Sequence, residues 1–230
     1  MFRNGGNVKM IKKINSPAKV NNIVNIQSVQ NNDNILLKNM DGYFQEKFYY
    51  TDIYDDTKMK KLVGSIKSQI RSSDEYSHYI GFLKNELGLS HCAVLGNVSA
   101  EDASLEFHHY PFTIHDIINL SISRHILLGK KFNSFTIIKE VLDDHYNNII
   151  GLVPLSLTVH ELVHAGEIFV NLNQVYGDIN EFNKKYSFAM TDDMIEKFNK
   201  LIELSESNAP YSENNILKKI YDNNEDNDRT

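Results

Sequence analysis

Apolar side chains recur at the three- and four-residue spacing of an amphipathic helix in several stretches of this chain. The spacing predicts a helix over residues 57–87, with a second helical piece over 74–86, and further helices that begin at Thr113, Ser134 and Thr191. Side chains with a hydroxyl group cap a helix, because they accept hydrogen bonds from the free amide groups of its first turn. Helices are therefore expected before, within and after the middle of the chain.

The middle of the chain also carries the alternating pattern of short strands. Residues 92–98 are apolar, 99–103 form a polar turn, and 104–109 alternate between apolar and polar positions. Two such runs on either side of a turn predict a β-hairpin. Its second strand ends at the paired histidines His108 and His109.

Residues 149–155 form a second extended run that leads directly into a helix. Thr158 is predicted to begin this helix, and Glu161 stands three residues later, which is the spacing of a capping box. Apolar positions continue the helical pattern toward Gly177. Strands and helices thus mix along the chain, and the expected fold class is α+β.

A length of 230 residues suits one domain with appendages, or one and a half domains. The candidate chemistry falls in the central part of the chain. We expect an N-terminal arm or short strands over 1–45, a helical segment over 46–90, a core over 91–175 with a helical insertion over 112–147, C-terminal helices over 176–206, and an acidic, flexible tail over 207–230.

The net charge of −6 counts against a dedicated nucleic-acid binder, because such proteins are usually basic. The basic residues are segregated, however, so the overall balance leaves a local binding surface open. They gather in two places, Lys58, Lys60, Lys61, Lys67 and Arg71 in the first, and Arg124, His125, Lys130 and Lys131 in the second.

The number of cysteines and the length of the apolar runs indicate the cellular compartment of the protein. Cys92 is the only cysteine, so no internal disulfide can form, and we interpret it as a small buried hydrophobe. The chain shows no signal-peptide pattern and no apolar run long enough to span a bilayer, so a cytoplasmic protein without membrane contact is expected. Frequent Asn and absent Trp suggest an A/T-rich genome, as in a virus or a low-GC bacterium. For a viral protein the compartment is the host cytoplasm.

Two histidine clusters carry the candidate chemistry. His160 and His164 stand four residues apart on a predicted helix, so their rings project from one face and can chelate one cation. His108 and His109 are adjacent on a predicted strand, so they point to opposite sides. One histidine of this pair can ligate a metal while its neighbour acts as a general base.

These residues resemble the HNH endonucleases, also called ββα-metal or His-Me finger nucleases, and the colicin-type DNases in particular. The pattern of that family is a hairpin that ends in Glu-x-His-His, a segment with an Asn, and a helix with His-x-x-x-His. The resemblance covers residues 91–175, and it implies a ββα-metal core extended by a helical insertion and flanking helices. The matching residues are Glu106, His108, His109, His160 and His164.

The resemblance also implies a role for each matching residue. His108, His160 and His164 would hold one divalent metal ion, His109 would be the general base that activates water, and Glu106 would be a charge beside the site. Zn²⁺ is the ion expected on isolation, and Mg²⁺, Mn²⁺ or Ni²⁺ are alternatives for activity.

One position departs from the family's pattern. The Asn that orients the base normally lies nine residues before the first histidine of the helix, and Gly151 stands there in this chain. Asn148 is the replacement that we expect, with Asn147 or His145 as alternatives.

The expected partner is nucleic acid, with DNA first, and a protein partner or a larger assembly is a further expectation. The phosphate contacts are assigned to basic residues near the predicted site, because neutralising phosphates dominates such binding. The candidates are Arg124, Lys130 and Lys131, with Lys60, Lys61, Lys67 and Arg71 behind them.

Two other functions stay open. His160-Glu161-x-x-His164 spells the HExxH motif of zinc peptidases, in which Glu161 would be the base and Glu167 a possible third ligand. The short run between Pro154 and His160 and the capping role of Glu161 count against this reading. The site could instead be a degenerate relic in a structural or regulatory protein. Three further histidines, His78, His115 and His125, are interpreted as structural.

Overall fold

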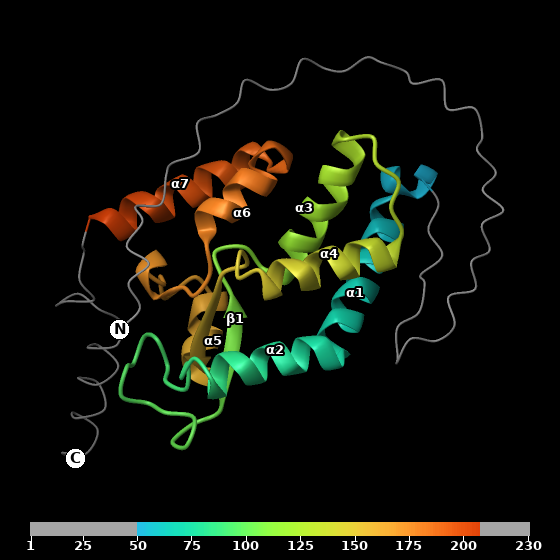
Figure 1. The fold of residues 1–230 in the computed structure, drawn as a ribbon. Helices are drawn as coiled ribbons and strands as arrows, with labels where there is room; N and C mark the ends of the chain where they lie inside the picture. Colours follow the sequence, from blue (N-terminus) through green and yellow to red (C-terminus); the bar gives the residue numbers. More distant parts are fainter. Residues whose placement is uncertain (1–49, 208–230) are drawn as a thin grey trace.

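The structure, a computed structural model, describes residues 50–207. The predicted arm over 1–45 and the tail beyond Ser207 lie outside the described residues. The described chain has an α+β fold, in which helices surround a small sheet (Figure 1). Its elements are a 3-10 turn Tyr50–Tyr54, α1 Asp56–Ser72, α2 Asp74–Asn85, β1 Leu105–His109, α3 Ile114–Leu127, α4 Ser134–Tyr146, β2 Leu152–Ser156, α5 Leu157–His164, a 3-10 turn Leu172–Gln174, α6 Ile179–Tyr186, a 3-10 turn Ser187–Ala189, and α7 Asp192–Glu206.

Several helices begin where the sequence predicts. Thr113 caps α3 and forms a capping box with Asp116, because each side chain accepts a hydrogen bond from the backbone amide of the other residue. Thr191 caps α7 through its side chain. α4 begins at Ser134, although the capping side chain belongs to Asn133. The division of the first helical stretch into α1 and α2 also agrees with the prediction.

The sheet consists of β1 and β2, which pair antiparallel with His108 opposite Val153. The predicted hairpin is therefore wrong. Residues 92–98 form turns instead of a strand. The residues that flank this segment, His91 and Ser99, form a single isolated β-bridge. An alternating strand pairs with a run that can bury the matching face, and β2 is buried along its whole length.

The sheet lies against α5 on one face and α2 on the other. Val153 packs with Val159 of α5, whereas Phe107 and Leu152 pack with Tyr79 of α2. Figure 1 shows both helices beside β1. Successive residues of β1 therefore enter two different environments, as the alternation of a strand requires.

The largest hydrophobic core lies in the helical part of the molecule. α3 and α4 form the connection from β1 to β2, and they pack with α1, α6 and α7 around isoleucines such as Ile66, Ile117 and Ile137. The insertion between the two strands is thus a packed part of the fold.

α5 is shorter than predicted. It ends at His164, where Gly166 has a φ of 73° and the Glu167 amide donates to the Leu162 carbonyl at 2.9 Å. The predicted continuation toward Gly177 is therefore wrong. A separate helix, α6, follows after a connecting segment.

The start of α5 also differs from the prediction. β2 runs directly into the helix, and the capping position belongs to Ser156, whose side chain makes no capping hydrogen bond. Thr158 and Glu161 lie inside the helix. The predicted capping box is wrong, and Glu161 has no capping role.

None of the described helices has the length and the apolar character needed to cross a membrane.

Candidate metal centre

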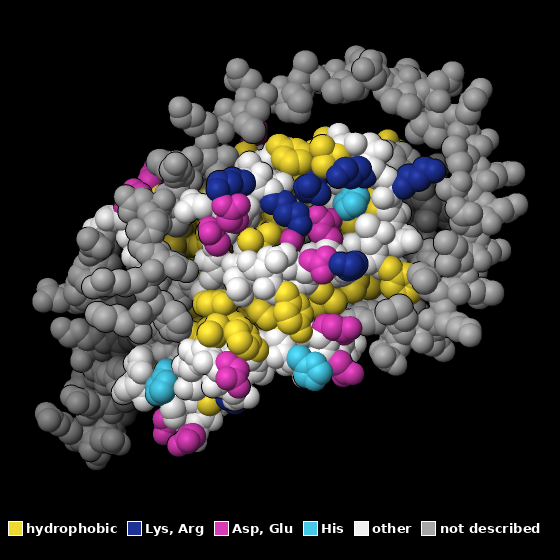
Figure 2. Space-filling model, in the orientation of Figure 1, with side chains coloured by type: hydrophobic (Ala, Val, Ile, Leu, Met, Phe, Trp, Pro, Cys, Tyr) yellow, Lys and Arg dark blue, Asp and Glu magenta, His cyan; other side chains and the backbone are white. Residues whose placement is uncertain are grey.

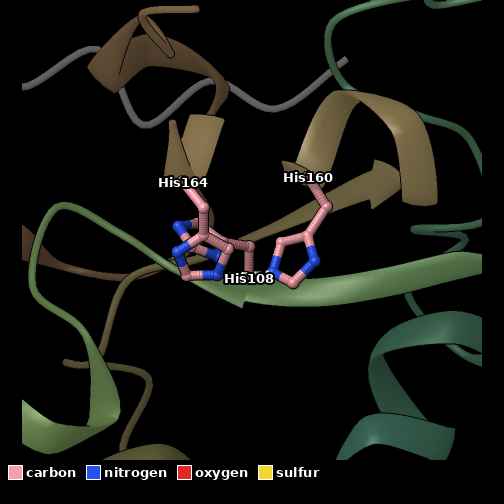
Figure 3. Close-up of side chains that lie close together, drawn as sticks. All are labelled: His108, His160 and His164. Atoms are coloured by element: carbon pink, nitrogen blue, oxygen red, sulfur yellow. Dashed lines mark hydrogen bonds between the residues drawn. The ribbon is translucent and has the colours of Figure 1, made fainter. Parts of the chain in front are cut away.

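Three histidine side chains meet between β1 and α5. His108 comes from β1, and His160 and His164 come from α5 (Figure 3). Their potential ligand atoms all lie within 4.8 Å of one another. The Nε2 atoms of His160 and His164 are 3.1 Å apart. Within residues 50–207, these three histidines form the group of potential metal ligands whose ligand atoms lie this close together.

Local structure explains why these rings meet. His160 and His164 are separated by one helical turn, so both face the sheet side of α5. His108 belongs to the face of β1 on which α5 packs, because its cross-strand neighbour Val153 contacts Val159. The strand and the helix therefore deliver their imidazoles to the same point.

Glu106 orients one of the rings. It lies two residues before His108, on the same face of β1, and its Oε2 is 2.7 Å from His160 Nδ1. A carboxylate can only accept, so His160 carries a proton on Nδ1 and leaves the lone pair of Nε2 for a ligand. Glu106 thus lies beside the site, where the sequence predicts it.

Burial keeps the histidine at the centre of the cluster neutral. His108 is buried, and desolvation together with the neighbouring rings of His160 and His164 lowers its pKa to about 4. Burial also lowers the pKa of His160, although Glu106 acts in the opposite direction. Neutral imidazoles are the form that binds metal ions.

The donor set fits a divalent transition metal. Two nitrogens bound tetrahedrally to one Zn²⁺ at about 2.0–2.1 Å lie about 3.3 Å apart, close to the 3.1 Å between His160 and His164. Imidazole donors favour Zn²⁺, Ni²⁺ or Mn²⁺ over Ca²⁺, which prefers oxygen. The described residues thus bring together three histidines that could hold one ion, and His164 is the exposed member of the group.

His109 lies on the opposite face of β1, as adjacent strand residues must. It is buried, its Nε2 lies 2.9 Å from Nε2 of His145, and its ring stacks on Tyr76 with an angle of 10° between the planes. Burial, followed by the neighbouring His145, holds the pKa of His109 well below its usual value.

The other ring nitrogen of His109, Nδ1, has no hydrogen-bond partner among residues 50–207. The residue as a whole is 3% exposed. One nitrogen of the ring is thus held by His145, and the other makes no hydrogen bond within the described part of the chain.

The Asn148 side chain does not reach His109. Its Oδ1 accepts hydrogen bonds from the hydroxyls of Tyr176 at 2.9 Å and Tyr79 at 3.4 Å, and its φ is 56°. Asn147 is the exposed C-cap of α4. Neither residue contacts His109, and His145 is the neighbour that does.

The surroundings of Gly151 leave no room for the Asn that HNH endonucleases carry at the corresponding position. A Cβ at this position would lie 2.0 Å from the Tyr110 carbonyl oxygen, closer than any real contact. The Gly151 carbonyl also accepts a hydrogen bond from the Tyr110 amide at 3.0 Å. The two backbones meet so closely that no side chain fits at position 151.

The predicted phosphate-binding residues lie apart from the cluster. Arg124 forms an ion pair with Glu140 at 3.2 Å, and Lys130 and Lys131 are exposed in the segment between α3 and α4. This segment follows the far end of α3, whose 14 residues span about 21 Å at 1.5 Å per residue. Figure 2 shows Lys and Arg side chains over α3 and α6, whereas α5 lies lower in the same orientation.

A cation closer to the cluster is Arg71, in the last turn of α1. Burial is the largest cause of the lowered pKa values of His108, His109 and His160, and neighbouring histidine rings add to it. The positive charge of Arg71 is a further, smaller cause. Arg71 is exposed. The sequence placed it among the secondary basic residues, because only the fold brings the end of α1 toward β1.

The other predicted residues have separate environments. His125 is buried and bonds to Glu140 at 2.8 Å, and Cys92 is fully buried, as predicted. His115 is exposed on α3 and contacts Asn119 of its own helix, and His78 is exposed on α2. Glu167 is exposed and does not belong to the histidine group.

Comparison with known proteins gives one family. The family model for the Bacteriophage G278-like virion protein matches residues 10–230, so the chain belongs to this family. No curated protein and no solved structure matches the chain.

Proposed function

We propose that this member of a phage virion protein family is a metal-dependent endonuclease of the HNH type that hydrolyses phosphodiester bonds of DNA. The observation that carries the proposal is the convergence of His108 with His160 and His164 on one unit formed by β1, β2 and α5. This order of two antiparallel strands and a helix supports a ββα-metal core, with α3 and α4 as the insertion.

In this proposal His109 is the general base. Nδ1 of His109 takes a proton from water while the water oxygen forms a bond to phosphorus, and the bond from phosphorus to the 3′ oxygen breaks. A divalent metal ion held by His108, His160 and His164 would supply positive charge to the phosphate and the leaving oxygen. Glu106 keeps His160 in the ligating tautomer.

His108 and His109 serve one substrate although they point to opposite faces. Among the described residues β1 pairs only with β2, so the other edge of β1 carries no strand. A strand is narrow, since neighbouring strands lie about 4.8 Å apart. His109 is also the last residue of β1. A phosphodiester that crosses the end of this edge can meet both side chains, with Arg71 as the nearby cation for a phosphate.

A zinc peptidase is the second candidate, because Glu161 is exposed beside His160 and has no capping role. Against it, α5 has eight residues, and His160 lies in its first turn. The third imidazole comes from β1, upstream of the motif. The short helix and the strand-borne ligand favour the nuclease.

The family match makes a larger assembly part of the proposal. A virion protein is packaged in or builds the particle, so we place the protein in the phage particle as well as in the host cytoplasm.

The test is a nicking assay on supercoiled plasmid with Zn²⁺, Mg²⁺, Mn²⁺ or Ni²⁺, accompanied by metal analysis of each variant. We expect His109→Ala to lose cleavage by about 100-fold or more while it keeps the metal, since general-base catalysis contributes about 10²–10⁴-fold. Glu161→Gln and the exposed control His115→Ala should cut like the wild type.

The opposite pattern would overturn the proposal. A wild type that cuts a peptide substrate, together with an inactive Glu161→Gln variant that retains its metal, would establish the peptidase. A metal-loaded wild type that cuts neither substrate would leave the third candidate, a degenerate site in a structural or regulatory protein.

A further inference from the structure

His145 is a buried histidine in the last turn of α4, and both of its ring nitrogens are engaged. Nδ1 lies 2.6 Å from the Val141 carbonyl oxygen, and Nε2 lies 2.9 Å from Nε2 of His109. The residue is not part of the histidine cluster, and it lies 36 positions after His109 in the sequence.

The hydrogen bonds determine where each proton lies. A carbonyl oxygen can only accept, so Nδ1 of His145 must carry a proton. A neutral imidazole has one proton, and Nε2 of His145 is therefore an acceptor. Burial lowers the pKa of His145 to about 4, so the ring is neutral near pH 7. It follows that Nε2 of His109 donates, and that the lone pair of His109 stands on Nδ1.

Aromatic side chains hold both rings in this arrangement. Tyr76 stacks on His109 and meets His145 edge to face, with ring centroids 5.3 Å apart. Tyr79 contacts His145 from α2 in a similar edge contact at 5.5 Å. The rings cannot turn over without breaking these contacts and the bond to Val141.

We propose that His145 is the positioning residue of the site, which fixes His109 in the tautomer whose Nδ1 has a lone pair to accept a proton. The inference rests on the proposed endonuclease function. It supplies from α4 the orienting group that Gly151 cannot carry, since the Tyr110 carbonyl fills the space of a Cβ there. In the alternative tautomer of His109, Nδ1 would hold a proton and could not act as a base.

Two substitutions at position 145 separate positioning from packing. Gln places an acceptor oxygen near the position of Nε2, whereas Phe keeps the ring shape and removes the acceptor. We expect His145→Phe to lower the nicking rate by about 100-fold or more while metal content is unchanged. His145→Gln should stay within about tenfold of the wild type. The control is His125→Gln, a buried histidine bonded to Glu140 that does not touch His109.

The tautomer is read directly by ¹⁵N–¹H correlation spectra of the histidine rings in the full chain. We expect His109 to be protonated on Nε2 in the wild type and in His145→Gln, and a mixture of tautomers in His145→Phe. This spectrum needs no activity, so it also tests the inference if His145→Phe does not fold.

The outcomes distinguish the two proposals. Finding Nδ1 of wild-type His109 protonated, or equal nicking by His145→Phe and the wild type, overturns the role of His145. An inactive wild type whose His109 has the expected tautomer overturns the proposed endonuclease function. In that case the hydrogen bond between His145 and His109 has no catalytic role.

Discussion

At the scale of single residues, the site depends on where protons are placed on imidazole rings. His160 has its Nδ1 proton directed to Glu106, and His109 has its Nε2 directed to His145. Each contact leaves the second nitrogen of the ring without a proton: Nε2 of His160, which lies beside His164, and Nδ1 of His109. In the proposed function the first nitrogen would bind the metal ion and the second would act as the general base.

The contact between Glu106 and His160 gives a prediction for metal affinity. Glu106→Gln replaces a charged acceptor by a neutral one, so the ligand should become less basic and less well oriented. We expect the affinity for Zn²⁺ to fall by about 10–100-fold, the usual effect of losing such a partner. Competition with a chelating dye near neutral pH measures the change.

Glu161→Gln is the matched control, because Glu161 is exposed and lies beside the same histidine without bonding to it. Its affinity for Zn²⁺ should equal that of the wild type. Equal affinities in all three proteins would show that Glu106 does not support the ligand.

At the scale of elements, the site is made where β1 and β2 pass into other segments. α5 continues directly from β2, and β1 ends at His109 before the backbone of Tyr110 meets Gly151. This close approach anchors the ends of the two strands to each other. The relative position of His108 and α5 therefore depends on a backbone contact that only glycine allows.

Gly151→Ala should strongly destabilise the protein. The new Cβ would lie 2.0 Å from the Tyr110 carbonyl oxygen, so the strands would have to separate. We expect a loss of about 3 kcal/mol or more in the free energy of unfolding, at the upper end of what overpacking costs. Chemical denaturation followed by circular dichroism measures it.

Gly64→Ala is the control for this substitution. Gly64 lies within α1, and a Cβ there meets no atom within 4 Å. Alanine is the better helix former, so this variant should be more stable than the wild type by about 0.5–1 kcal/mol. A Gly151→Ala variant as stable as the wild type would contradict the close approach of the strands.

At the scale of the whole molecule, the buried polar groups make stability depend on pH. His145 is neutral inside the protein down to about pH 4, whereas an exposed histidine in the unfolded chain titrates near 6.5. Between these values the unfolded state binds more protons than the folded state, so stability falls as the pH is lowered. His109 acts in the same direction, and the raised pKa of buried Asp144 opposes it at the acid end.

We expect the free energy of unfolding to decrease from pH 6.5 to about pH 4, with a contribution of about 3 kcal/mol from His145 alone. Above pH 6.5 this contribution should be constant. Urea midpoints over this range measure the effect, and His145→Gln should flatten the curve. A midpoint that does not change with pH in the wild type would contradict the burial of neutral histidines.

The local parts of the fold and of the site were determined by the sequence itself. Helix starts such as Thr113 depend on contacts within one turn, and the opposite directions of His108 and His109 follow from strand geometry. The pairing of His160 with His164 follows from helical spacing in the same way. These features involve neighbours within about four residues, so the pattern of side chains predicts them.

The tertiary structure decided which distant segments meet. β1 pairs with β2 across the α3–α4 insertion instead of with residues 92–98, because the buried face of β2 is the better partner for an alternating strand. The end of α5 at Gly166 and the contact of His145 with His109 depend in the same way on packing. Long-range contacts arise from the burial of faces that belong to several elements, and no single stretch of sequence contains that information.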